Sequence, residues 1–326
     1  MKLVAWFSEV RKEDGSLAGG KGANLGELTQ AGIPVPSGFV VTAGAYFGFL
    51  EQAGLKPHIA RLLDGLDLAD NAALQQAAAE IRTLVTTAGM PAEVAEQIAR
   101  AYARMDCGHV AVRSSATAED LAEASFAGQQ STYLNVLGEE PVLRAVRECW
   151  ASLFESQAIF YRHRAGFEHL SVGIAVVVQR MVQSERSGVM FTVNPVSGDP
   201  TQIVIEAVYG LGEAAVSGIV TPDMYIVDKG SLTIVDRSIV KQDRELVRNP
   251  DAGPGGENNC WRQIDFTLAR APKLTDEQVR ELAALGARVE AHYGRPQDIE
   301  WAHEGGEFML VQARPVTTGG GGAGAA

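Results

Sequence analysis

Four short segments of the sequence combine residue types that can hold a phosphate group or a metal ion. The first is the Gly-Gly-Lys-Gly run at Gly19 to Gly22. Glycines let backbone N–H groups point at an anion, and the N-terminus of a helix adds partial positive charge. Lys21 would meet phosphate as a mobile point charge. A surface turn that happens to carry a lysine explains these four residues equally well.

The second and third segments place an arginine, a glycine and a threonine near predicted strands. Arg113 ends an apolar run and can bind a planar anion, although Ser114 and Ser115, followed by acidic residues, also fit the capped start of a helix. In the segment Phe126 to Asn135, Gly128 permits close approach of the backbone to a ligand, and Thr132 can donate to a phosphate oxygen. Taken alone, that segment is better interpreted as a loop entering a strand.

The fourth segment is a pair of strands near the C-terminal end. Residues alternate along Gln297 to Trp301, so Asp298 and Glu300 share one face, and Gln312 and Arg314 share a face of the next strand. If the strands pair, Glu300 and Gln312 offer oxygen ligands to Mg²⁺, and Arg314 can neutralise charge on a phosphoryl group. The alternative is the solvated polar face of a hairpin.

Two further patterns imitate nucleotide-binding motifs. The spacing from Gly15 to Lys21 fits a P-loop, but Gly22 stands where the hydroxyl that holds Mg²⁺ is required. The run Gly210 to Ala215 fits a dinucleotide fingerprint, but Gly218 and Pro222 stop the following helix too early. The six histidines show no metal-ligand spacing, and we assign no catalytic histidine to this chain.

Hydrophobic periodicity predicts the elements that position these residues. Helices are expected at 21–31, with Gly32 at its C′ position, and at 72–87, 92–105 and 275–293, the last capped by Thr275. Strands are expected at 3–7, 109–113, 174–179, 187–193, 203–208, 224–227, 232–235, 297–302 and 308–313. The polar stretch Arg244 to Pro272 is interpreted as a long loop or flap.

Composition limits the class of protein. The 326 residues suit two lobes, and a net charge of −12 argues against a nucleic-acid-binding surface. Neither a signal peptide nor an apolar run of membrane-spanning length is found, so no membrane association is expected. Three widely separated cysteines argue against a disulfide framework or zinc site and favour the cytoplasm.

Taken in order, these motifs resemble the ATP-binding domain of the phosphoenolpyruvate synthase, pyruvate phosphate dikinase and rifampin phosphotransferase family. The resemblance covers residues 1–316 and is carried by the segments 19–28, 31–39, 112–120, 125–130, 188–192 and 312–316. It implies an α+β, ATP-grasp fold with nucleotide bound between two lobes. The expected boundaries are 1–180 and 181–316, with the Gly/Ala tail 317–326 as a linker stub.

The resemblance also implies roles for individual residues. Those expected to bind ATP are Lys21, Arg113, Gly128, Thr132 and Gln179, with Met181 near the adenine and Arg314 on the phosphates. Mg²⁺ would be held by Glu300 and Gln312, with Asp298 as a further candidate. Lys21, Arg113 and Arg314 would be the catalytic residues, acting by positioning and charge neutralisation.

In this family, ATP first phosphorylates a histidine on a separate swivelling domain. The Ser-His motif that carries that histidine is absent from this sequence, so the chain is expected to bind Mg-ATP without completing the reaction. The leading expectation is part of a phosphoenolpyruvate synthase (a pyruvate, water dikinase). A rifampin phosphotransferase domain and a stand-alone nucleotide-sensing or partner-binding module are the alternatives.

Overall fold

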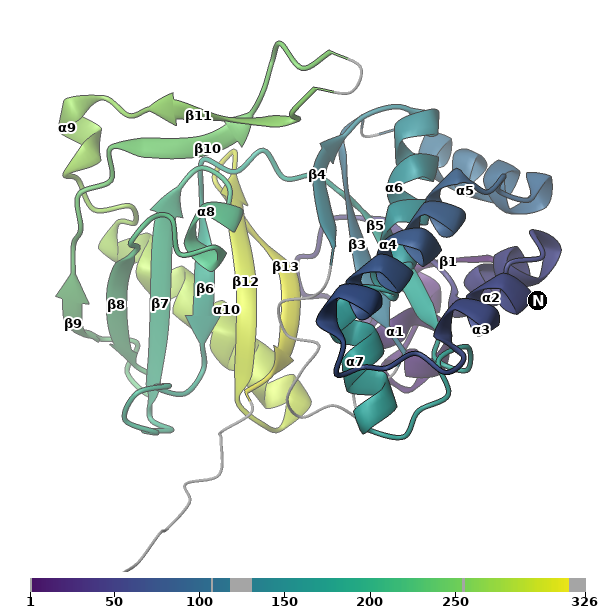
Figure 1. Cartoon of the computed structure of the whole chain (residues 1–326). Helices are drawn as coiled ribbons and strands as arrows, with labels where there is room; N and C mark the ends of the chain where they lie inside the picture. The colour runs from purple at the N-terminus through teal and green to yellow at the C-terminus, as the bar shows by residue number, and fades with distance from the viewer. Residues whose placement is uncertain (1, 107, 118–130, 254–255, 317–326) are drawn as a thin grey trace, which may run out of the picture. The chain divides into compact units, whose positions relative to one another are not determined.

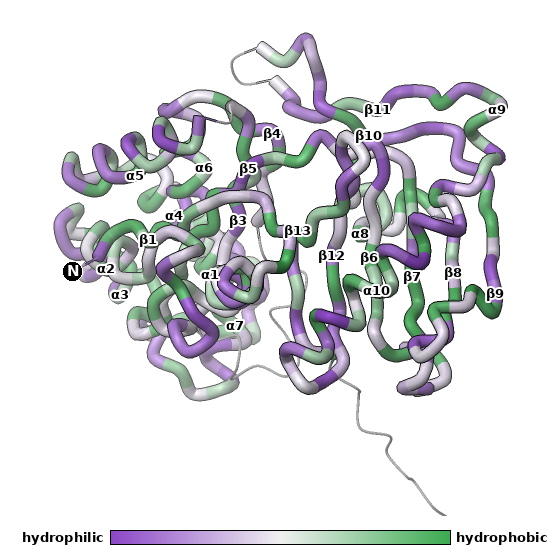
Figure 2. Tube along the Cα trace, turned by 180° about the vertical axis from the view of Figure 1, so that it is seen from behind, coloured by the Kyte–Doolittle hydropathy of each residue, from purple (hydrophilic) through white to green (hydrophobic). Residues whose placement is uncertain are grey.

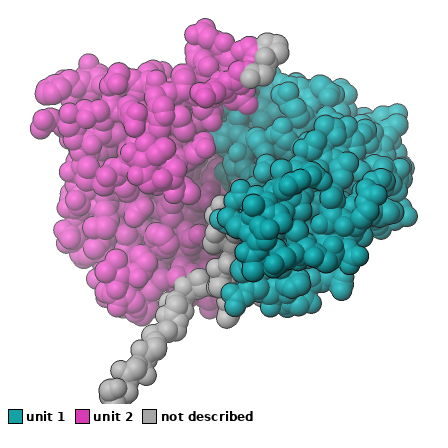
Figure 3. Space-filling model, viewed as in Figure 1, with its two compact units in different colours: residues 1–30, 36–181 teal, residues 31–35, 182–326 magenta. Residues whose placement is uncertain are grey.

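The computed structural model describes residues 2–106, 108–117, 131–253 and 256–316. Within these ranges the chain divides into two compact units, each mixing helices with an antiparallel sheet, which confirms the α+β class. One unit comprises residues 1–30 and 36–181, and the other residues 31–35 and 182–326 (Figure 3). No helix in the described ranges combines the length and apolar character needed to cross a bilayer.

The first unit is built on a five-stranded sheet in the order β1-β2-β5-β3-β4, with neighbouring strands antiparallel (Figure 1). Its strands are β1 (Val4–Trp6), β2 (Gly38–Val41), β3 (Val110–Ala116), β4 (Thr132–Val136) and β5 (Ile174–Arg180). Its helices are α1 (Gly15–Gln30), α2 (Ala43–Gln52), α3 (Lys56–Leu63), α4 (Asn71–Thr87), α5 (Ala92–Met105), α6 (Glu139–Ser152) and α7 (Ser156–Arg164). Two 3₁₀ turns, η1 (Phe7–Glu9) and η2 (Lys12–Asp14), precede α1.

The main core of this unit lies on one face of the sheet. Val112 of β3 and Val178 of β5 pack there against α2 and α4 to α7. Helix α4 is alanine-rich and starts at Asp70, whose side chain accepts hydrogen bonds from two backbone N–H groups of the first turn. Helix α5 alternates polar and apolar segments along its length in Figure 2, as expected for a helix with one face on a core.

The second unit is built on a six-stranded antiparallel sheet in the order β13-β12-β6-β7-β8-β9. Its strands are β6 (Arg186–Phe191), β7 (Gln202–Tyr209), β8 (Asp223–Asp228), β9 (Ile234–Ser238), β12 (Gln297–Glu304) and β13 (Glu307–Pro315). Helix α10 (Asp276–Tyr293) packs on one face, so close that a Cβ added at Gly286 would lie 2.7 Å from the Met190 side chain. Thr275 caps α10 as predicted, accepting a hydrogen bond from Gln278 N at 3.2 Å.

The stretch 244–272 is not the loop that its composition predicted. It contains the hairpin β10 (Arg244–Arg248) and β11 (Asn259–Gln263), and then the short helix α9 (Phe266–Ala269). Cross-strand contacts stabilise the hairpin: Arg262 forms an ion pair with Glu245 at 2.8 Å, and the Arg244 guanidinium lies 4.5 Å from the centroid of the Trp261 ring. Polar residues therefore form strands here because of cross-strand contacts, which cannot be recognised from the local sequence.

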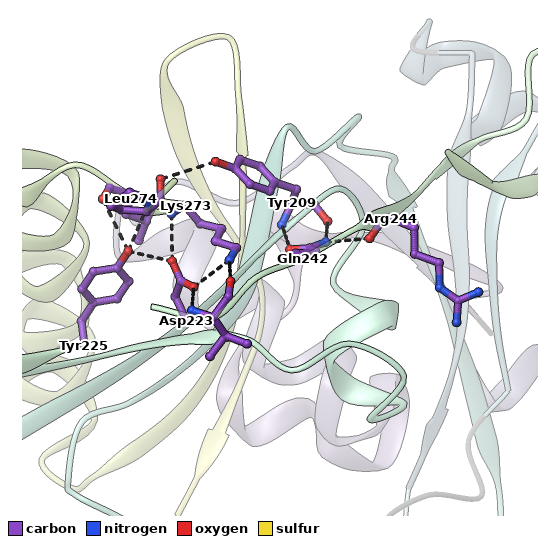
Figure 4. Close-up of polar contacts among 9 residues, drawn as sticks. Tyr209, Asp223, Tyr225, Gln242, Arg244, Lys273 and Leu274 are labelled. Carbon is purple, nitrogen blue, oxygen red and sulfur yellow. Dashed lines mark hydrogen bonds and ion pairs between the residues drawn. The ribbon is translucent and has the colours of Figure 1, made fainter. Parts of the chain in front are cut away.

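Buried polar contacts anchor both ends of this hairpin segment (Figure 4). At its start, the Gln242 side chain accepts a hydrogen bond from Tyr209 N at 2.9 Å and donates to Tyr209 O at 3.0 Å. At its end, Lys273 Nζ lies 2.7 Å from Asp223 Oδ1, and both side chains are fully buried. Tyr209 ends β7 and Asp223 begins β8, so these contacts hold the segment to the ends of two interior strands of the six-stranded sheet. Breaking a buried ion pair is strongly destabilising, because it leaves an uncompensated charge.

Candidate functional site

The lysine of the glycine-rich run is placed by a close contact between α1 and β3. Gly19 interrupts α1 with φ 67° and ψ 170°. A Cβ at this position would lie 2.2 Å from Ser115 O, so only glycine fits without movement of the strand. The Ser115 hydroxyl donates to Ala18 O at 2.9 Å and accepts from Gly22 N at 3.1 Å. This turn sets Lys21, whose Nζ donates to Ser114 O at 3.2 Å.

Three of the predicted ATP-binding residues of the first unit lie on one face of its sheet. Arg113 of β3 pairs with Thr132 of β4, and Ala111 of β3 pairs with Gln179 of β5. Paired residues, and residues two apart on a strand, point to the same side of a sheet. Arg113, Thr132 and Gln179 therefore lie on one face, opposite to the face that carries Val112.

Helix α1 packs over this same face. A Cβ added at Gly22 would lie 3.0 Å from the Val40 side chain, and Val40 pairs with Val177, the residue that also pairs with Arg113. The structure thus brings Lys21, Arg113, Thr132 and Gln179 together on one side of the first unit, although 158 residues separate the first from the last in the sequence (179 − 21).

These residues differ in their accessibility. Thr132 is exposed and Arg113 is half-buried. Gln179 is 1% exposed and its side-chain amide donates to Pro36 O at 3.4 Å, while Met181 is 8% exposed and its backbone N donates to His109 O. Gly128, predicted from the resemblance, lies outside the described residues.

In the second unit, the four predicted metal and phosphate residues form two adjacent cross-strand pairs. Glu300 pairs with Gln312, and Asp298 pairs with Arg314. The register shifts just after Glu300, where Val311 is the extra residue of a bulge, and bulges re-aim the side chains beside them. All four side chains project from the face opposite to the buried Ile299, which lies on the α10 side.

Two opposite charges on this face are in direct contact. Arg314 Nε lies 2.8 Å from Asp298 Oδ2. Burial raises the pKa of Asp298 above its usual range, and the Arg314 guanidinium opposes that rise. The predicted phosphate-binding arginine thus forms an ion pair with the predicted metal-binding aspartate.

A further carboxylate on this face was not identified from the sequence. Met190 pairs with Ile205, so Val189 stands opposite Glu206 on β7, and Val189 also pairs with Glu300. Glu206 therefore lies in the same cross-strand row as Glu300, and burial together with the Asp298 charge raises the pKa of Glu206. Glu206 is the one acidic residue in the largely apolar run Gln202 to Tyr209, but only the registers of β6 with β7 and β12 place it beside Glu300.

The donor set of this face suits Mg²⁺ better than a metal enclosed by protein ligands. Within the described ranges, no three His, Cys, Asp or Glu side chains are close enough together to hold a metal ion. Mg²⁺ commonly takes one or two carboxylates and completes its shell with phosphate oxygens and water. Glu300 and Gln312, facing each other across β12 and β13, fit that limited role.

The chain is an α+β protein with one large sheet in each unit. A lysine and an arginine lie on one face of the first large sheet, and carboxylates with an arginine lie on a face of the second. Comparison with known proteins identifies the family to which the chain belongs. Residues 15–325 match the family model described as pyruvate phosphate dikinase, AMP/ATP-binding domain, and the chain belongs to this family.

Curated relatives of high similarity carry one name. The chain is 48% identical over 324 residues to a probable phosphoenolpyruvate synthase of Methanocaldococcus jannaschii, covering 98% of this chain and 27% of that protein. It is 45% identical over 358 residues to the phosphoenolpyruvate synthase of Pyrococcus furiosus, covering 97% of this chain and 44% of that protein. The chain thus spans less than half the length of either relative.

A solved structure of D-alanyl-alanine synthetase A from Vibrio cholerae shows a weaker likeness. The sequence identity is 12% and the TM-score 0.30, over 69% of this chain and 47% of that one. A similarity of that size carries no argument about this chain.

Proposed function

We propose that this chain binds Mg-ATP, as an ATP-grasp domain, and performs the ATP-dependent phosphoryl-transfer half-reaction of a phosphoenolpyruvate synthase-like enzyme. The acceptor is a histidine on a separate swivelling domain, in the same full-length protein or supplied in trans. Family membership and the name shared by the relatives support this choice over a rifampin phosphotransferase.

The observation that carries the proposal is the paired arrangement of Glu300 with Gln312 and of Asp298 with Arg314. When bound, Mg²⁺ would neutralise phosphate charge, and Glu300 and Gln312 would hold it, with Asp298 beside them. Arg314 would exchange its contact with Asp298 for a phosphate oxygen. A bound polyphosphate supplies the negative charge that this exchange requires.

On the first unit, Lys21 and Arg113 would bind the phosphates, with Thr132 as a hydroxyl donor. The Gly19 turn fixes Lys21, so its ammonium group is positioned before ATP binds. Phosphoryl transfer depends mainly on such positioning and on neutralisation of charge. Gln179, near the end of β5, and Met181, just after it, are buried. Gln179 would contact ATP, and Met181 would lie near the adenine.

Phosphotransfer to a swivelling domain supplied in trans tests this function. Lys21→Ala and Arg314→Ala should each slow transfer of label from ATP to the histidine on the order of 10²-fold, because each removes a charge that the transition state requires. A matched control is Arg237→Ala, which removes a surface arginine paired with Asp276 and should leave the rate unchanged. Near-normal transfer by both Lys21→Ala and Arg314→Ala would contradict the proposed roles.

A further inference from the structure

A fully buried arginine lies in the first unit, away from the proposed nucleotide-binding face. Arg162 of α7 is 0% exposed. Its Nε donates to Nδ1 of His169 at 3.4 Å, but its two terminal nitrogens, Nη1 and Nη2, find no hydrogen-bond acceptor among the described residues. Native proteins seldom leave buried polar atoms without a partner, so this arrangement requires an explanation.

A second unsatisfied donor belongs to the same core. The Tyr46 hydroxyl of α2 is fully buried and also has no hydrogen-bond partner within the described ranges. The charge of Arg162 acts on this hydroxyl, lowering the pKa of Tyr46 against the larger effect of burial. A buried aromatic ring lies near each group: the Phe154 ring centroid is 5.6 Å from the Arg162 guanidinium carbon, and the Trp150 ring centroid is 6.2 Å from that of Tyr46.

The Arg162 guanidinium and the Tyr46 hydroxyl together offer hydrogen-bond donors and one positive charge. Burial lowers the pKa of Arg162 to about 10, so the guanidinium remains charged at neutral pH. Burial, with Arg162 and His163, lowers the pKa of His169 to about 4, so that imidazole is neutral. In the part of the chain that the structure describes, no carboxylate forms an ion pair with Arg162. A water molecule would satisfy the donors but would leave the charge uncompensated.

We propose that Arg162 and Tyr46 form an internal binding site for a small monovalent inorganic anion such as chloride. One negative charge balances the one guanidinium, and the tightly packed rings of Phe154 and Trp150 favour a small ion over phosphate. Tyr46 and Trp150 lie in the core on the Val112 side of the sheet, whereas Arg113 lies on the other side. The anion site is therefore separate from the nucleotide site and does not depend on the proposed function.

Chloride-dependent stability tests this site. The whole chain is melted by calorimetry in sodium chloride and in sodium gluconate at equal ionic strength. At chloride concentrations above the Kd, each tenfold rise in chloride should raise the Tm of the wild-type protein by about 2 °C, because a ligand that binds the folded state stabilises it by mass action. Tyr46→Phe keeps the ring and removes one donor, so it should weaken chloride binding about tenfold. Arg162→Met should abolish the dependence.

Crystals soaked in sodium bromide give a second readout that needs no variant. We expect an anomalous bromide peak between the Arg162 guanidinium and the Tyr46 hydroxyl. The proposal is overturned if wild type and Tyr46→Phe respond equally to chloride, since a general salt effect would act on both. It is also overturned if the crystals show no bromide peak there, with water or a carboxylate of the chain beside Arg162. If Arg162→Met fails to fold, Tyr46→Phe and the bromide peak decide the question.

Discussion

The contact between Gly19 and Ser115 allows a prediction whose size follows from the structure. Gly19 has φ +67°, and an added Cβ would lie 2.2 Å from a backbone oxygen of the interior strand β3. With ψ 170°, Gly19 lies in a region that is essentially restricted to glycine, and holding another residue there costs on the order of 1–3 kcal/mol. Forcing a methyl group into a packed contact costs roughly a further 1–3 kcal/mol. Gly19→Ala should therefore destabilise the protein by about 2–6 kcal/mol.

Gly54 provides a matched control in the same unit. Its φ is +64°, but a Cβ there meets nothing within 4 Å. Gly54→Ala should therefore cost only the backbone term of about 1–2 kcal/mol. Urea unfolding of both variants gives the difference, and ATP titration adds a second readout, since Gly19→Ala also displaces Lys21. Equal destabilisation by the two substitutions, with unchanged ATP affinity, would refute the role assigned to the Gly19 turn.

Three further predictions concern the second unit. Lys273→Met should destabilise the protein by about 3–5 kcal/mol in urea unfolding, because it leaves the buried Asp223 carboxylate without its counter-charge. Arg314→Gln should raise the pKa of Asp298 further, as read from its side-chain carbon chemical shift in a pH titration. A raised carboxyl pKa favours the folded state at low pH, so this variant should lose more stability than wild type as pH rises through that pKa. Glu300→Ala should weaken the Mg²⁺ dependence of ATP binding in calorimetry.

Each of these predictions has a control or a contradicting result. Lys229→Met removes a less buried ion pair with Glu290 and should cost only about 1 kcal/mol. If Lys273→Met cost no more than this, burial would not explain the importance of the Lys273–Asp223 pair. An unchanged Asp298 titration in Arg314→Gln would show that the 2.8 Å contact does not form in solution. An unchanged Mg²⁺ titration in Glu300→Ala would exclude Glu300 from the metal site.

The sequence predicted those elements whose signals are local. Thr275 and the apolar spacing along α10 predicted that helix and its cap, and both are confirmed. Strands were also predicted at 297–302 and 308–313, and β12 and β13 lie there, joined by a turn at Gly305 and Gly306, which both adopt positive φ. Strand alternation made Glu300 and Gln312 neighbours only on the condition that the two strands pair, and the structure pairs them.

Features that depend on distant contacts could not be predicted in this way. The β10–β11 hairpin is held by pairs such as Arg262 with Glu245, and the glycine and proline residues between its strands indicated a loop instead. Asp223 gives no local sign that it meets Lys273, 50 residues later. Glu206 joins the row of Glu300 only through the registers of two intervening strand pairs, which sequence periodicity does not specify.

Calorimetric titration of ATP into the whole chain, with and without Mg²⁺, tests the central claim most directly. The wild-type chain should bind ATP with an affinity that increases when Mg²⁺ is present, and Lys21→Ala should weaken binding in both conditions. Glu300→Ala should lose the response to Mg²⁺ while retaining the weaker, metal-independent binding. Absence of ATP binding by the wild-type chain in the presence of Mg²⁺ would contradict the assignment of this chain as a Mg-ATP-binding unit.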